Sequence, residues 1–144
     1  MRTTQFFFHL AASPATMFYW LALPTFASMR AEIKAYERTD NENLSSYEPE
    51  DKQVFGFTLM FSIGIKGQVG ADYFEVDVAS PGYLEHLIPR PFFLRHTILA
   101  MDYNILEVVA LMTRYVDELE EDSWEALASK ISRVARWEFE DYKA

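Results

Sequence analysis

Two carboxylates have a spacing that can support chemistry. Glu75 and Asp77 alternate with Phe74, Val76 and Val78 in the run ADYFEVDVA. On an extended strand this alternation places both acids on one face, about 6–7 Å apart. Two carboxylates so placed can bind a hard cation or act as general acid and base. The same pattern is typical of the solvated face of an antiparallel sheet, and we favour that interpretation.

Other reactive side chains are sparse. Glu32-Ile33-Lys34 has the Glu-x-Lys form of metal-dependent nucleases, but no acid precedes Glu32 to complete the metal ligands. The chain contains no cysteine that could complete a metal site with His86 and His96, and we interpret both histidines as structural. The sequence contains no Gly-x-Ser-x-Gly elbow and no phosphate-binding Gly-Lys-Ser/Thr loop. A small metal-dependent hydrolase using Glu75, Asp77 and His96 is therefore an alternative hypothesis.

The element that positions Glu75 and Asp77 is a predicted hairpin spanning residues 55–79. In its first arm, FGFTLMFSIGI, every second residue from Phe55 to Ile65 is large and apolar. The connector Lys66–Gly70 is short and contains two glycines, as hairpin loops often do. Burial of each large apolar side chain contributes roughly 1.5–3 kcal/mol as an upper figure, so this ribbon is the expected platform of the fold.

The remaining elements predict an α+β fold, with an antiparallel sheet of about four to five strands and about three helices packed on one face. Expected caps are Ser80 for the first helix, Asp102 for the second and Asp122 with Glu125 for the third. We expect strands near residues 31–37, 54–66, 71–79, 95–101 and 137–141, and helices near residues 81–88, 103–120 and 123–136. Trp137 and Phe139 alternate with acidic residues near the C-terminus, and this pattern predicts that the two aromatic side chains anchor the core.

Residues 1–28 differ from the rest of the chain. They contain Arg2 as the only charged residue, and Pro14 and Pro24 interrupt their apolar run. The segment fits three descriptions: a signal peptide, a membrane helix, or upstream sequence included by a start codon set too early, with Met29 as the true start. We favour the last, because the segment has no helical period. The predicted folded domain is then residues 29–144.

Composition narrows the class of partner. The chain has 144 residues, a formal net charge of −9 and no cysteine. The absence of cysteine excludes disulfides, thiolate metal sites and cysteine nucleophiles. The negative charge disfavours binding to nucleic acid and to anionic membranes, and it favours a basic protein partner. We predict no cofactor and no bound metal.

From about Met29, the chain resembles the immunity protein 8 family of bacterial polymorphic toxin systems. The resemblance lies in AEIKAYE, in Tyr47-Glu48-Pro49, in the hairpin through SPGYL, and in Arg95-His96, Asp102-Tyr103, Trp124-Glu125 and the terminal WEFEDY. It implies a small cytoplasmic protein, encoded beside a toxin, that binds and neutralises the toxin without catalysis.

The resemblance and the charge together give the leading hypothesis. The chain is expected to bind and occlude the C-terminal toxic domain of its cognate toxin, which is expected to be basic, with a nuclease as one candidate. We place Glu75, Asp77, Glu138 and Glu140 on the contact surface, and the oligomeric state stays open. An exported or membrane-tethered acidic accessory protein, with a genuine leader, is a further alternative.

Overall fold

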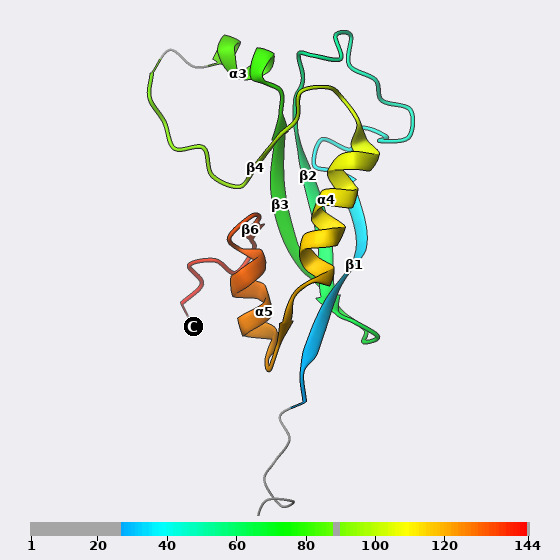
Figure 1. Cartoon of the computed structure of the whole chain (residues 1–144), viewed down its shortest axis with the longest axis vertical. Helices are drawn as coiled ribbons and strands as arrows, with labels where there is room; N and C mark the ends of the chain where they lie inside the picture. The colour runs from blue at the N-terminus through cyan, green and yellow to red at the C-terminus, as the bar shows by residue number, and fades with distance from the viewer. Residues whose placement is uncertain (1–26, 88–89, 144) are drawn as a thin grey trace, which may run out of the picture.

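The computed structural model describes residues 27–87 and 90–143 (Figure 1). The prediction about the leader, residues 1–28, therefore lies almost entirely outside the described residues. Within the described part of the chain, no helix is both long enough and apolar enough to cross a membrane.

The predicted hairpin is present. Strand β2 (Gly56–Ile65) pairs antiparallel with β3 (Asp72–Ala79), and Phe61 lies opposite Phe74. Alternation places one face of both strands in the core. The fully buried side chains of this face are Leu59, Phe61, Ile63, Phe74, Val76 and Val78.

The hairpin is the centre of a curled, mixed sheet with the order β4-β3-β2-β1-β5. Strand β1 (Met29–Arg38) pairs with β2, and β5 (Glu120–Glu121) pairs with the start of β1. Two short strands share the other edge of β3: β4 (Thr97–Leu99) beside its C-terminal end and β6 (Arg136–Trp137) beside its N-terminal end.

The expectation of a purely antiparallel sheet was wrong, because β4 runs parallel to β3. The connection from Ser80 to His96 contains a helix and a loop that swings away from the sheet before returning (Figure 1). A crossover of this length is what a parallel pair requires, whereas an antiparallel neighbour is reached by a short turn. The α+β class itself is confirmed.

Two helices complete the core. Helix α4 (Ile105–Asp117) buries Val108, Met112 and Val116, and α5 (Trp124–Ile131) buries Leu127, Ala128 and Ile131. All six side chains belong to the same cluster as the apolar face of the hairpin. The short helix α3 (Pro81–Leu87) has no buried residue, so packing of a third helix on this face is not confirmed.

The helix caps differ in part from the predictions. The Ser80 hydroxyl accepts a hydrogen bond from the Tyr83 amide at 3.2 Å, as predicted for the start of α3. Asn104, not Asp102, caps α4 and accepts from the Glu107 amide. Ser123, not Asp122, caps α5. In both corrections the capping side chain is one or two residues closer to the first helical turn, where its oxygen reaches the free amides.

The C-terminal region is less regular than expected. Helix α5 ends at Ile131 instead of residue 136, because the chain must turn there to bring β6 alongside β3. The predicted strand at 137–141 is only the two residues of β6, followed by turns. Trp137 packs against the core as predicted, but Phe139 is 43% exposed, so its predicted role as a core anchor was wrong.

The acidic run at the end of α4 is compensated by basic residues from elsewhere. Arg30 on β1 pairs with Glu120 at 2.9 Å and also donates to the Asp117 carbonyl at 3.2 Å. Lys130 on α5 pairs with Glu121. Hydrogen bonds from Ser28 and attraction to Arg30 lower the pKa of Glu120. These contacts offset the unfavourable position of acids at a helix C-terminus.

Candidate partner-binding surface

The structure brings the four predicted contact acids to one edge of the sheet. Glu75 and Asp77 lie on β3, on the side of the strand opposite Phe74 and the core. Strand β6 pairs Arg136 with Glu75 and Trp137 with Phe74, so the residues after β6 emerge next to β3. We call Glu75, Asp77, Glu138 and Glu140 the acidic edge.

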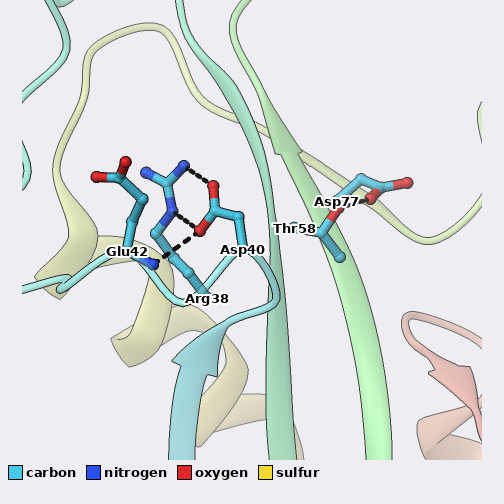
Figure 2. Close-up of polar contacts among 5 residues, drawn as sticks. All are labelled: Arg38, Asp40, Glu42, Thr58 and Asp77. Carbon is cyan, nitrogen blue, oxygen red and sulfur yellow. Dashed lines mark hydrogen bonds and ion pairs between the residues drawn. The ribbon is translucent and has the colours of Figure 1, made fainter.

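Glu75 and Asp77 share one arginine. The Arg136 Nη1 lies 2.9 Å from Glu75 Oε2, and its Nη2 lies 3.8 Å from Asp77 Oδ2. Asp77 also accepts a hydrogen bond of 2.6 Å from the Thr58 hydroxyl on β2 (Figure 2). These groups are about half exposed, and exposed ion pairs contribute only about 0–1 kcal/mol each. The contacts therefore fix the orientation of the carboxylates more than they stabilise the fold.

Glu138 and Glu140 are also held in place. Glu138 accepts from the Tyr73 amide at 2.8 Å through Oε1, and its own amide donates to the Tyr73 carbonyl at 3.0 Å. Glu140 accepts from Arg95 at 3.1 Å. Glu75, Glu138 and Glu140 line one open hollow of about 290 Å³, together with Tyr73, Arg136, Trp137 and Asp141. Asp77 lies beside this hollow, joined to it by Arg136.

An aspartate between two tryptophans holds β6 in position. Asp72 Oδ2 accepts hydrogen bonds from the indole nitrogens of Trp124, at 2.8 Å, and Trp137, at 3.0 Å. Both rings also contact Phe74, which Trp137 stacks upon and Trp124 meets edge-on. Because α5, β6 and β3 meet at Asp72, this residue determines where the acidic edge lies relative to the sheet.

A second polar cluster was not predicted from the sequence. The Arg38 guanidinium is buried at the end of β1 against the rings of Tyr47 and Phe57, which meet edge-on, and its central carbon lies 4.0 and 4.8 Å from their centres. It donates to Asp40 at 2.9 Å through Nε, and Nη2 completes a bidentate pair (Figure 2). The alternation in the sequence provides no signal for this burial, because Arg38 has the same parity as Glu32 and Lys34, and a register shift between Ile33 and Ala35 precedes it.

The pKa values follow from these contacts. The Arg38 hydrogen bond lowers the pKa of Asp40 below its ordinary value, and a hydrogen bond from the Glu42 amide adds to this effect. Burial works against the charge of Arg38, but its hydrogen bonds with Asp40 and Tyr47 raise the pKa of its guanidinium. Burial raises the pKa of Tyr103, which packs against the same aromatic group. At neutral pH Arg38 and Asp40 are both charged, and their ion pair ties the loop after β1 to the sheet.

The residues of the alternative hydrolase hypothesis do not converge. Glu75 and Asp77 turn to Arg136, whereas the His96 Nε2 lies 2.8 Å from the Ser132 carbonyl after α5. In residues 27–87 and 90–143, no group of three histidine or acidic side chains is placed to hold a metal ion. His86 lies on α3 with its Nδ1 at 2.6 Å from the Gly82 carbonyl.

The chain folds as a small α+β domain that carries the acidic edge on one side of its sheet. The family model described as Immunity protein 8 matches residues 31–142, and the chain belongs to this family. No curated protein and no solved structure matches the chain. Membership identifies it as an immunity protein directed against a toxin.

Proposed function

We propose that this chain binds the C-terminal toxic domain of its cognate toxin in the cytoplasm and neutralises it by covering its active face. The family match over residues 31–142 is the observation that carries the proposal. No reaction and no cofactor is part of this function. The alternative of an exported accessory protein depends on residues 1–28, which lie almost entirely outside the described residues.

The acidic edge is the proposed contact surface, and electrostatics is the reason. The chain carries 22 acidic and 13 basic residues, so a basic domain is attracted from a distance. Four carboxylates held by neighbouring groups keep their geometry without rearrangement on binding. Such preorganisation reduces the entropic cost of forming the complex. A toxin that binds phosphate groups would present the complementary basic face.

The experiment measures association between this protein and a catalytically inactive form of the toxic domain encoded at the same locus. The variant Glu75→Gln/Glu140→Gln removes two charges of the acidic edge and keeps side-chain size. We expect association to slow by about tenfold at low salt, and the difference to shrink above about 0.5 M salt because screening removes steering.

The matched control removes the same number of charges elsewhere. Glu48→Gln/Glu50→Gln changes two exposed acids in the loop after β1. We expect this control to change the association rate by less than about threefold, because its charges face another part of the surface. Equal slowing by both double variants would show that only net charge matters and would remove the acidic edge as the contact surface. Absence of any binding by the wild-type protein would contradict the function itself.

A further inference from the structure

A continuous apolar groove lies between strand β4 and helix α4. Two hollows, of about 420 and 560 Å³, adjoin there and share Ile98, Leu99 and Leu111 in their walls. We call them together the β4–α4 groove. Its aliphatic lining is accessible to a partner: Leu99 is 55% exposed and Leu111 is 44% exposed. Leu94 and Met101, at the two ends of β4, are also exposed.

The strand beside the groove has a free edge. β4 is the last strand in the sheet order, and it meets only β3 among the described strands. The His96 carbonyl accepts from Asp77, and the Ala100 amide donates to Ala79. Because backbone groups alternate along a strand, the amides of Thr97 and Leu99 point away from β3. A free edge of this kind can pair with an added strand.

The charges at the groove differ from those of the rest of the surface. Arg133 lines one hollow and Arg114 the other, and neither forms an ion pair with any residue that the structure describes. By contrast, the arginines that form ion pairs are Arg30, Arg38, Arg95 and Arg136. The chain as a whole has an excess of acids, so unpaired arginines at this groove are a local exception. They can bind a carboxylate of a partner segment whose apolar side chains occupy the groove.

The acids near the groove lie at one end only. Asp102 and Glu107 line the hollow that contains Arg114, whereas the hollow that contains Arg133 is lined by no acidic side chain. His96, which shares that hollow, uses its Nε2 to contact the Ser132 carbonyl. The best position for a partner carboxylate is therefore at Arg133, beside the apolar walls formed by Leu94 and Leu111.

We propose that the β4–α4 groove binds an extended segment of the toxic domain, which adds a strand to the free edge of β4. The segment places apolar side chains against Leu99 and Leu111 and a carboxylate against Arg133. This inference depends on the proposed function and adds a second, chemically different contact: the acidic edge steers a basic face, and the groove holds an apolar segment with an acid. Arg133 and Val134 line the groove and Arg136 and Trp137 line the hollow at the acidic edge, so the two surfaces use adjacent parts of the chain.

The test uses the full-length protein and the inactive toxic domain from the same locus. Leu111→Asp places a charge in the apolar wall, and Arg133→Glu reverses the charge at its rim. We expect each to raise Kd by about tenfold or more, because a buried anchor or a desolvated charge pair is lost. On complex formation, hydrogen exchange of the Thr97 and Leu99 amides should slow by at least about tenfold, because new main-chain hydrogen bonds protect them.

Two control variants match these changes outside the groove. Leu106→Asp alters a leucine of the same helix that is 73% exposed, and Lys66→Glu reverses an exposed charge in the hairpin loop. Both should bind within about threefold of the wild type, since surface changes away from an interface have small effects. If Leu111→Asp fails to fold, as judged by circular dichroism, the charge reversal and the exchange measurement still decide the question.

Three outcomes would overturn the inference. If the wild type binds the toxic domain and the groove variants bind equally well, the groove is not a contact and the proposed function stands. If the wild type does not bind, both fail together. If the protein alone self-associates and Leu111→Asp returns it to a monomer, the groove is an interface between two copies of this chain and not a site for the toxin.

Discussion

Replacement of Asp72 is the change whose effect the structure defines most closely. One carboxylate oxygen accepts from two indole nitrogens, at 2.8 and 3.0 Å. Asp72→Ala leaves both N–H groups without this acceptor, and an unpaired buried donor costs about 1–3 kcal/mol. Because both tryptophans are only half-buried, water replaces part of each bond, and we take about 1–1.5 kcal/mol for each. The expected loss in the free energy of unfolding is therefore about 2–3 kcal/mol.

Asp72→Asn is the matched variant. Its amide oxygen can take the position of Oδ2 and accept from both indoles, so we expect it to lose less than about 1 kcal/mol. Urea unfolding followed by far-ultraviolet circular dichroism and by tryptophan emission measures both variants. Equal destabilisation by the two changes, or an Asp72→Ala protein within about 0.5 kcal/mol of the wild type, would show that this oxygen does not join α5, β6 and β3 as described.

Three further predictions concern stability. Arg38→Met should lower the free energy of unfolding by about 1–3 kcal/mol, because it removes a cation held against two aromatic rings, whereas Arg38→Lys should lose less; urea unfolding of both variants measures this. Gly64→Ala should lose about 1–3 kcal/mol in the same assay, because its Cβ would lie 2.2 Å from the Gly70 carbonyl oxygen, and an unchanged midpoint would refute that contact. The pKa of Asp40 is lower in the folded protein, so its contribution to stability is present above the unfolded value of about 3.9 and is lost as pH falls through the lower folded value. Unfolding measured between about pH 6 and pH 2 should therefore show the stability advantage of the wild type over Asp40→Asn disappearing in acid, and a constant difference would contradict the assignment.

The long hairpin could be predicted because its signal is repeated. Alternation over the whole of β2 specifies a face at every second residue, and a shift by one residue would expose the entire apolar set. The start of α3 was likewise predictable, since Ser80 followed by Pro81 combines a cap with a favoured first position.

Short and distant pairings could not be predicted from local pattern. Strand β5 consists of Glu120 and Glu121, two residues with low strand preference, and it forms because Arg30 on the opposite strand neutralises Glu120. The parallel direction of β4 depends on where the loop before it returns, which no periodicity encodes. On α4, the apolar Leu106 is exposed, because Val108 takes the inward position in that turn.

The acidic edge, too, was predictable only in part from the sequence. The strand expected near residues 137–141 indicated that Glu138 and Glu140 would meet a sheet, and β6 does bring them beside Glu75. The role of Arg136 was not predictable, because it depends on the register that places it opposite Glu75 and within 3.8 Å of Asp77. The helix expected near residues 123–136 would have included Arg136, which instead lies on β6 and orients two carboxylates. Whether the acidic edge contacts a toxin stays a prediction.

The most direct test of the central claim is co-expression in growing cells with the active toxic domain from the same locus. We expect wild-type protein to restore growth and to co-purify with the toxic domain in a stoichiometric complex. The variant Glu75→Gln/Glu140→Gln should protect less well when expression is limiting, while Glu48→Gln/Glu50→Gln should protect fully. Cells that die despite abundant folded protein, with no complex recovered, would contradict neutralisation by binding.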